Sequence, residues 1–424
     1  MTEQDEGPRP DGAQDVPGQR QRLFFHVGLP KSGSTYLQTV LGTHRAQLRE
    51  HDHVYPFVGR EGMFHAAVEM AGTPARWGLD PDEIDGTFAH LLRRGRRLGG
   101  TVVLSHEIFG AATQDQVDAI APLLAEFDLH VVVTARDLGR SVTAAWQEEV
   151  KNGRVRTFAE FSDGLLDEDA TAPDAGRTFW RSQHLMNILA RWGALVPPDH
   201  VHVVPCPPPG TAPALLWERF AEAIDLPADA VDLSAIPTRN ESLGAPQVAF
   251  LREVLEAVDD RLEQPWHARV AKRWFAQTLL GAVPAAKPVA PAELTEQLAR
   301  IARSWVEEVG AAGYRVHGDL EDLVPRPTAS AHPHPDDVRA EDVLAGLPGV
   351  VAEMLVRVRG LHEDVGAARA EADALVVERD RLSSRVEELE AAAAEPPPPP
   401  PPVTRYPWVP RRVRALRRRL RRGA

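Results

Sequence analysis

The stretch FFHVGLPKSGSTYLQ, residues 24–38, joins a short apolar run, a loop rich in glycine and serine, and the start of an amphipathic segment. The apolar run has the length and composition of a buried strand, and the residues from Thr35 onward have helical spacing. Where a strand, a tight loop and a helix N-terminus follow one another, unpaired backbone N–H groups and the positive end of the helix dipole meet at one point. The stretch therefore predicts an anion site suited to a phosphate group.

The side chains of this loop add charge and hydroxyl donors. Lys31 supplies a full positive charge, and a hydroxyl follows at three of the next four positions. A Walker A loop needs the order Gly-Lys-Ser/Thr, but here Lys31 precedes Gly33. The alternative interpretation is an ordinary strand–turn–helix with serine as the helix N-cap. The candidate phosphate-binding residues are Pro30, Lys31, Ser32, Gly33, Ser34 and Thr35.

The string PKSGST directly after a strand resembles the phosphosulfate-binding loop of the sulfotransferases, which usually reads PKSGTT or PKSGST. The resemblance is to the bacterial and carbohydrate-type members and covers residues 23 to about 320. It implies that the loop holds the 5′-phosphosulfate of 3′-phosphoadenosine 5′-phosphosulfate (PAPS). Lys31 would then stabilise the charge that grows on the sulfonate and the bridging oxygen as the S–O bond breaks. This chemistry requires no metal, and we expect none.

A second motif, Thr-Ala-Arg-Asp, lies where the expected strand 130–135 ends. Arg136 would point its guanidinium into the same crevice as the loop, where a bidentate grip on phosphate is natural. The resemblance implies that Arg136 contacts the 3′-phosphate of PAPS together with a serine eight positions later. Here that position is Ala144, and Ser141 is the substitute that we expect. A buried salt bridge is the alternative role for Arg136.

The expected strand 101–105 is followed by His106 and Glu107. Transfer of a sulfuryl group to a hydroxyl needs a base within hydrogen-bond reach of that hydroxyl. The string LSHEIF is similar to the carbohydrate-type pattern, which has Ser-x-Glu here, so we expect Glu107 to be the base and keep His106 as the other candidate. Alternatively, Glu107 caps the next helix and His106 fills space.

The polar loop TRNESLG, residues 238–244, resembles the C-terminal nucleotide-contacting loop of the sulfotransferases. The resemblance implies that Asn240 and Ser242 contact phosphate or ribose. A simple helix N-cap is the other interpretation of this loop.

Short apolar runs alternate with amphipathic segments between residues 23 and 323, which predicts an α/β fold with a largely parallel, P-loop-like sheet flanked by helices. In such sheets ligands bind at the carboxyl ends of the strands, where every early motif lies. Strands are expected at 23–28, 101–105, 130–135 and 201–205, and helices near 34–49, 114–127, 138–151, 179–193, 213–224, 245–262 and 291–312.

The remaining chain divides by composition. Apolar residues from Leu347 to Leu389 repeat with alternating steps of four and three, which predicts a parallel two-stranded coiled coil and hence a homodimer. A single amphipathic helix lying on the globular domain is the alternative. We expect six segments: a disordered N-terminus 1–22, the α/β domain 23–323, a linker 324–345, the coiled coil 346–395, a polyproline spacer 396–403 and an Arg-rich tail 404–424.

Charge is unevenly distributed along the chain. The formal net charge is −13, yet residues 404–424 contain nine arginines and no acidic residue. Such a tail is expected to contact an anionic surface, with a membrane favoured over nucleic acid. The single cysteine, the polar N-terminus and the lack of an apolar run of membrane-spanning length predict a cytoplasmic protein, with the tail at the inner membrane face.

Together these features predict a PAPS-dependent sulfotransferase that acts on a hydroxyl, of a carbohydrate or glycolipid, by direct in-line transfer. Two alternatives stay open. One is a catalytically inactive nucleotide-binding scaffold that works through its coiled coil and basic tail. The other is a P-loop-type kinase or NTP hydrolase, which the missing Walker order disfavours.

Overall fold

The computed structural model describes residues 20–166, 174–236, 242–328 and 334–394 of the chain. These residues fall into two compact units, one within residues 1–351 and one within residues 352–424. The expected disordered N-terminus, the polyproline spacer and the Arg-rich tail lie outside the described residues, apart from residues 20–22.

The first unit contains one six-stranded sheet in the order β2-β3-β1-β4-β5-β6, and every neighbouring pair of strands is parallel. The strands are β1 Arg22–His26, β2 His53–Val54, β3 Thr101–Ser105, β4 Asp128–Ala135, β5 Val201–Pro205 and β6 Arg315–Val316. The predicted parallel α/β fold is thus confirmed, together with its four expected strands. The two-residue strands β2 and β6 at the edges were not predicted.

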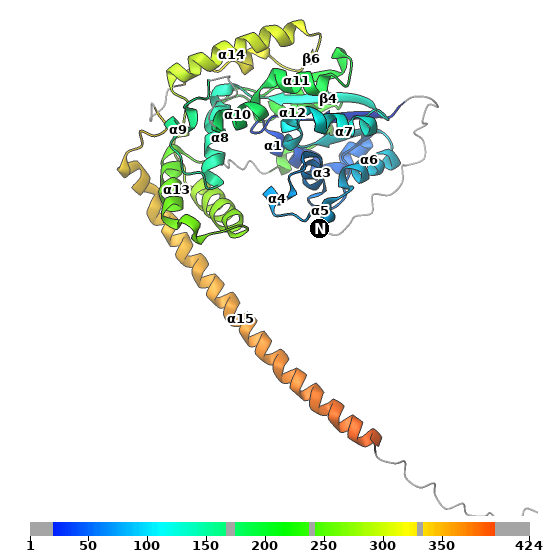
Figure 1. Cartoon of the computed structure of the whole chain (residues 1–424), viewed down its shortest axis with the longest axis vertical. Helices are drawn as coiled ribbons and strands as arrows, with labels where there is room; N and C mark the ends of the chain where they lie inside the picture. The colour runs from blue at the N-terminus through cyan, green and yellow to red at the C-terminus, as the bar shows by residue number, and fades with distance from the viewer. Residues whose placement is uncertain (1–19, 167–173, 237–241, 329–333, 395–424) are drawn as a thin grey trace, which may run out of the picture. The chain divides into compact units, whose positions relative to one another are not determined.

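Helices cover the sheet (Figure 1). The helix expected at 34–49 is two helices that break at His44, and the helix expected at 179–193 is two helices that break at His184. The helical segments are α1 Ser34–Thr43, α2 Arg45–Glu50, α3 Gly62–Ala71, α4 Pro74–Trp77, α5 Pro81–Ile84, α6 Thr87–Leu98, η1 Glu107–Ala111, α7 Gln114–Leu124, α8 Leu138–Lys151, α9 Phe158–Ser162, α10 Asp174–Gln183, α11 Leu185–Gly193, η2 Pro198–His200, α12 Leu215–Ala223, α13 Ala245–Val258, the π-helical η6 His267–Leu279, α14 Ala292–Ala311, η8 Leu320–Leu323 and α15 Ala340–Ala394. Of these, the segments that lie outside the expected helices are α3, α4, α5, α6, η1, α9, η2, η6 and η8.

Strand β1 lies at the centre of the sheet and is buried on both faces. Phe24 belongs to the core cluster that α1 and α12 form on one face. Phe25 points to the other face, where its ring centroid lies 4.6 Å from that of Phe109 and 5.0 Å from that of Trp192. Because successive residues of a strand point to opposite faces, two adjacent phenylalanines serve both layers. This packing holds the residues that follow β1 in place.

The carboxyl ends of β1, β3 and β4 meet at one edge of the sheet. His26, the last residue of β1, is in register with Ser105 of β3 and with Val132 of β4. The loop after β1, the His106–Glu107 pair after β3 and Arg136 after β4 therefore emerge side by side. The topology alone brings three of the predicted motifs to one edge.

The segment expected to be a linker makes tertiary contacts. The carboxylate of Asp336 accepts hydrogen bonds from the backbone N–H groups of Phe158 and Ala159, at 2.8 and 2.9 Å. The ring of His334 packs against Phe158 with 5.6 Å between the centroids. The long helix α15 begins at Ala340, six residues before the expected start of the coiled coil.

Within the described residues no helix is both long and apolar enough to cross a lipid bilayer.

Candidate anion-binding site at the edge of the sheet

The loop between β1 and α1, residues 27–33, continues along β4 before it turns. The N–H of Val27 donates to the carbonyl of Val132 at 2.9 Å, and the N–H of Leu29 donates to the carbonyl of Thr134 at 3.0 Å. These bonds extend the β1–β4 ladder past the end of the strand. The turn itself therefore begins only at Pro30, on the edge that Arg136 also occupies.

Two residues of the turn have left-handed backbone conformations. The φ angle of Lys31 is 69° and that of Gly33 is 88°. This φ angle favours glycine at position 33, and a Cβ atom there would also overlap the terminal methyl Cδ2 of Leu216. Gly33 is the N-cap of α1, and no side chain caps the helix within the described residues. The serine N-cap is therefore not seen, and Ser34 is the first helical residue.

Other side chains anchor the loop from within. The Ser32 hydroxyl contacts the carbonyl of Leu29 and the hydroxyl of Thr134, both at 2.6 Å, and is buried. The Cys206 thiol donates to the carbonyl of Ser32 at 2.8 Å, and the Gln183 amide donates to the carbonyl of Pro30 at 2.8 Å. Ser32 is thus engaged inside the protein.

His26 lies beneath the loop and links three strands. Its Nδ1 is 2.7 Å from the hydroxyl of Ser105 on β3, and its Nε2 is 2.9 Å from the hydroxyl of Thr134 on β4. Burial lowers the pKa of His26 to about 3, so the ring is neutral at pH 7. A Cβ on Gly28 would lie 2.5 Å from both Nε2 and the Thr134 hydroxyl, so the loop packs directly on this triad.

The structure brings Arg136 onto the same loop. Its Nη1 donates to the carbonyl oxygen of Lys31 at 3.2 Å. Burial lowers the pKa of Arg136, and the residues that the structure describes form no ion pair with it. The buried salt bridge considered for Arg136 is therefore not observed among them. Its Nε and the hydroxyl of Ser141 are both buried without a hydrogen-bond partner in the described part of the chain.

The ammonium group of Lys31 is paired, and the sequence did not indicate its partner. Its Nζ lies 2.5 Å from Oε2 of Glu148, whose carboxylate also contacts Lys151 at 2.9 Å and Lys272 at 2.6 Å. Burial raises the pKa of Glu148, but the three ammonium groups together outweigh it and hold the pKa well below its usual range. Three cations surround one carboxylate, so this corner of the site carries excess positive charge.

The second carboxylate of the site is Glu107, which is tied to α1. Gln38 Nε2 donates to Glu107 Oε2 at 3.1 Å. Burial raises the pKa of Glu107, but His106, the backbone, Gln38 and Ser34 outweigh it, so the net shift is downward and the group is a carboxylate at pH 7. The helix cap considered for Glu107 is supplied instead by His106, whose Nδ1 accepts from the N–H of Ile108 at 3.2 Å.

The C-terminal loop is described only in part, because Asn240 lies outside the described residues. The Ser242 hydroxyl donates to the amide oxygen of Gln147 at 3.3 Å, and the Gln147 amide donates to the carbonyl of Leu243 at 3.3 Å. Gln147 belongs to α8, the helix that also carries Ser141. The predicted C-terminal loop therefore packs against the helix that follows Arg136.

No model of a known protein family matches the chain, and no curated protein matches it either. What the site can do is therefore argued from its own residues. They are a loop of backbone donors at a helix N-terminus, one arginine with an unused buried donor, a cluster of lysines and an ionised carboxylate.

Proposed function

We propose that the chain is a PAPS-dependent sulfotransferase that moves a sulfuryl group to a hydroxyl acceptor, of a carbohydrate or glycolipid. The observation that carries the proposal is the hydrogen bond from the Arg136 guanidinium to the Lys31 carbonyl. It joins the two motifs that resemble the family's two phosphate contacts, although 105 residues separate them, and so supports the proposal. A nucleotide with phosphates at both its 3′ and 5′ positions needs two such contacts.

The 3′-phosphate would lie against Arg136 and Ser141. A buried polar group without a partner costs about 1–3 kcal/mol, and Arg136 Nε and Ser141 Oγ are two such groups within the described residues. A phosphate oxygen accepts from a guanidinium and from a hydroxyl, so one phosphate can satisfy both. The 5′-phosphosulfate would lie on the turn at Lys31, where the uncapped N-terminus of α1 offers backbone donors.

The transfer itself would use Glu107 and Lys31. The acceptor oxygen attacks sulfur, its proton passes to the Glu107 carboxylate, and the bond from sulfur to the 5′-phosphate oxygen breaks, which leaves 3′,5′-adenosine diphosphate. The lowered pKa of Glu107 keeps the group ionised at neutral pH, so its oxygens are free to accept the proton, and it acts as a weaker base than a carboxylate whose pKa is raised toward 7. His106 suits this role less well, because its Nδ1 already accepts a backbone hydrogen bond. Lys31 would stabilise the charge that leaves with the nucleotide.

The Lys31–Glu148 ion pair favours a second candidate function. In the absence of ligand the Lys31 ammonium is already paired with a carboxylate 2.5 Å away. A nucleotide must therefore compete with Glu148 or share the three lysines with it. If the nucleotide cannot displace Glu148 from Lys31, the domain is a catalytically inactive scaffold, and the C-terminal helix and tail carry the function.

The proposal includes a homodimer formed through α15. Apolar side chains at the coiled-coil positions of this helix are exposed, such as Leu361 at 45% and Leu375 at 64%. Exposed apolar residues at heptad spacing are typical of a helix that pairs with a second copy. The tail 404–424, which the structure does not describe, would contact an anionic membrane surface.

Thermal-shift titration of the purified full chain with 3′,5′-adenosine diphosphate and with ATP tests the proposal. We expect the bisphosphate to raise the melting temperature more than ATP does. A ligand stabilises the native state more the more tightly it binds, and the proposed site at Arg136 binds a 3′-phosphate that ATP lacks. Lys31→Ala should lose this shift, whereas the exposed Arg303→Ala on α14 should keep it. A larger shift with ATP would support the kinase interpretation. No shift with either nucleotide would contradict the transferase and would leave a scaffold that binds no nucleotide and works through its C-terminal helix and tail.

A further inference from the structure

An exposed tryptophan lies close to the histidine and the glutamate that follow β3. Within the described residues of the α/β domain, three large apolar side chains are exposed, namely Trp77 at 44%, Leu123 at 39% and Trp266 at 56%. Among the ring contacts of the described residues, those of Trp77 lead through Phe64 to His106. Trp77 is therefore an exposed apolar side chain that is connected to the candidate site.

We call the rings of Trp77, Phe64 and His106 the aromatic row. The centroid of Phe64, on α3, lies 5.2 Å from that of Trp77, on α4, and 5.8 Å from that of His106. Helix α3 also packs against η1, which begins at Glu107. Nδ1 of His106 lies 3.9 Å from Oε2 of Glu107. The aromatic row therefore ends at the carboxylate that would accept the proton in the transfer.

The backbone holds Trp77 at the surface. Helix α4 has four residues, none of them buried, and Gly72 and Gly78 lie on either side of it with φ angles of 61° and 67°. These left-handed conformations favour glycine and set the points at which the short helices end. The Phe64 ring meets the Trp77 ring at an interplanar angle of 90°, edge to face, so it covers only part of the indole. The exposed part lacks the stabilisation of burial, and a ligand that covered it would gain that stabilisation.

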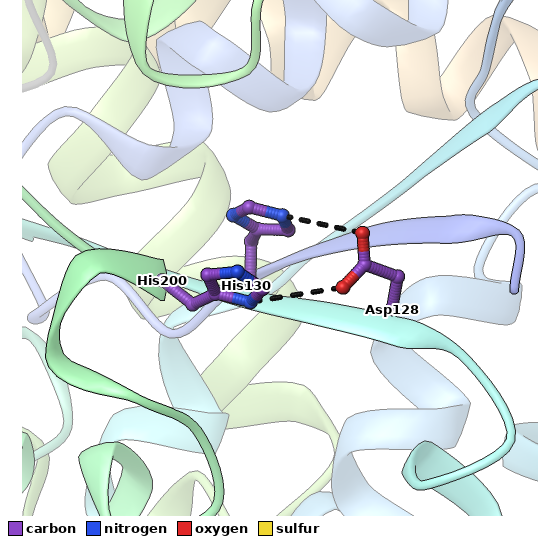
Figure 2. A group of neighbouring side chains, drawn as sticks. All are labelled: Asp128, His130 and His200. Atoms are coloured by element: carbon purple, nitrogen blue, oxygen red, sulfur yellow. Dashed lines mark ion pairs between the residues drawn. The ribbon is translucent and has the colours of Figure 1, made fainter. Parts of the chain in front are cut away.

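The histidine rings at the other end of the sheet are arranged differently, because they contact one another. The rings of His130 and His200 are parallel within 8° with 4.0 Å between their centroids, and Asp128 faces both of them (Figure 2). His130 Nδ1 lies 3.0 Å from His202 Nε2, and His202 Nδ1 lies 3.0 Å from His317 Nε2. Each ring of this group is a partner of another ring of the group.

Polar groups lie beside the aromatic row. His106 Nδ1 accepts from the N–H of Ile108 at 3.2 Å, so the neutral ring carries its hydrogen on Nε2. Within the described residues this Nε2–H has no hydrogen-bond partner, and the His106 side chain is 11% exposed. The guanidinium of Arg76 lies 5.8 Å from the centre of the Trp77 ring. The aromatic row therefore combines an apolar surface with hydrogen-bond donors and, at Glu107, an acceptor.

We propose that Trp77 and Phe64 bind the acceptor and that this acceptor is a saccharide, an inference that rests on the proposed transferase function. One face of a pyranose ring carries C–H groups that pack against an aromatic surface, and its rim carries hydroxyls that bind polar groups. Aromatic surfaces with a few placed polar groups are typical of small-molecule sites. A phenol gains most from an enclosed apolar pocket, whereas the half-exposed indole of Trp77 offers an open surface.

The saccharide would lie along the aromatic row with its reacting hydroxyl at Glu107. That hydroxyl donates to the carboxylate, and a neighbouring hydroxyl of the same sugar accepts from His106 Nε2–H. The rest of the saccharide extends over Phe64 to Trp77, away from the reacting atoms. Trp77 is therefore a specificity-determining residue. Its contacts are the same in the bound substrate and in the transition state, so their loss should raise KM and leave kcat nearly unchanged.

A glycan array of neutral saccharides, probed with the labelled full chain in the absence of nucleotide, tests the inference. Neutral saccharides are chosen because the Arg-rich tail does not attract them. We expect the wild type to bind, and Trp77→Ala to bind the best array ligand about tenfold or more weakly, as truncated tryptophans in binding sites do. Trp266→Ala is the matched control, because Trp266 is also exposed and lies 5.7 Å from the guanidinium of Arg269. It should bind as the wild type does.

Trp77→Phe separates the role of the ring from a general loss of structure. This variant keeps an aromatic surface and should recover most of the affinity that Trp77→Ala loses. A wild type that binds no neutral saccharide, a Trp77→Ala variant with full affinity, or a Trp77→Phe variant as weak as Trp77→Ala would overturn the inference. Tighter binding of 4-nitrophenol than of every saccharide would overturn the acceptor class.

The result also separates this inference from the proposed function. If 3′,5′-adenosine diphosphate raises the melting temperature but saccharide binding does not depend on Trp77, the transferase stands and the acceptor surface is wrong. If saccharide binding depends on Trp77 but no nucleotide binds, the surface stands and the transferase is wrong. Where both hold, steady-state assays with PAPS and the best saccharide should show a KM raised about tenfold in Trp77→Ala and nearly the same kcat.

Discussion

The guanidinium of Arg136 donates a hydrogen bond from Nη1 to the carbonyl oxygen of Lys31, 3.2 Å away. Arg136 follows β4 and Lys31 follows β1, and the two strands are neighbours in the parallel sheet. The bond therefore joins two loops at the same edge. It leaves the Nε of Arg136 buried without a partner among the described residues. The proposed nucleotide, with a phosphate at each end of its ribose, would use both loops.

Arg136→Lys should weaken the binding of 3′,5′-adenosine diphosphate about tenfold or more. The lysine keeps the positive charge but loses the planar fork that grips a phosphate. Hydrogen bonds to charged groups contribute about 1.5–3 kcal/mol, which corresponds to this loss. Calorimetric titration measures it, with Arg303→Lys on α14 as the control. Equal affinities for Arg136→Lys and the wild type would remove Arg136 from the nucleotide site.

Ser141→Ala should have opposite effects on stability and on binding. Without ligand, the buried hydroxyl has no partner in the described residues, so its removal should leave the free energy of unfolding unchanged or higher. With 3′,5′-adenosine diphosphate, the loss of one hydrogen bond should lower the affinity about fivefold. Urea unfolding and calorimetry measure the two effects. Thr143→Val removes a hydroxyl that already donates to the carbonyl of Arg140 and should not change the affinity. A destabilised Ser141→Ala would show that the hydroxyl has a structural partner.

Glu148→Gln should lower the free energy of unfolding at pH 7 by about 1.5–3 kcal/mol, the contribution of a hydrogen bond to a charged group, because the three lysines lose their shared negative charge. The folded-state pKa of Glu148 is depressed, so its contribution is present above the unfolded value of 4.5 and is lost as the pH falls below it. The difference between variant and wild type should therefore shrink in urea unfolding below pH 4.5. A constant difference from pH 7 to pH 3 would contradict this.

The same substitution should also strengthen the binding of inorganic sulfate. The anion would take the place of the carboxylate between Lys31, Lys151 and Lys272, so sulfate should raise the melting temperature of Glu148→Gln more than that of the wild type. Glu149→Gln is the matched control, because Glu149 pairs with Arg154 and Arg156 instead. Equal shifts in the two variants would mean that the lysines do not form an anion site.

His26 should make the protein less stable in mild acid. Its pKa is about 3 in the folded state and 6.5 in the unfolded state, so the unfolded chain binds the proton first. Through this group the free energy of unfolding falls by about 1.4 kcal/mol per pH unit between pH 6.5 and pH 3. His26→Gln should be less stable than the wild type at pH 7 but should show a flatter pH dependence. Urea unfolding from pH 7.5 to pH 4 measures both slopes, and parallel slopes would disprove the assignment. His90→Gln serves as the control.

Leu361→Glu combined with Leu375→Glu should convert a dimer into a monomer. Both residues lie on the apolar seam of α15, where a charge would enter the interface between two helices. Leu355 is also exposed, at 67%, but lies outside the seam, so Leu355→Glu is the control. Light scattering on the full chain gives the mass of each species. A monomeric wild type would rule out the homodimer.

The sequence by itself determined the central strands and several helices. Strand β3 and helix α8 begin and end at the predicted residues, and β4 and β5 lie where apolar runs of β-branched residues predict them. This works because the local sequence reflects burial: a strand buried on both faces is a run of apolar residues, and a helix with one buried face has apolar residues at helical spacing. The two-residue strands β2 and β6 are too short to show such a pattern. They exist because an adjacent strand offers unpaired backbone groups.

The residues of the candidate site also fall into those that the sequence predicted and those that only the structure brought together. The loop at Lys31, the arginine after β4 and the carboxylate after β3 were found from sequence, because each motif is local and a parallel sheet brings strand ends to one edge. Their partners were not found. Glu148 lies 117 residues from Lys31, and the hydrogen bonds of the buried histidines span 72 and 115 residues. Only the tertiary structure decided these contacts, because a charge or an imidazole has no preference for its partner until packing brings the two together and removes the water between them.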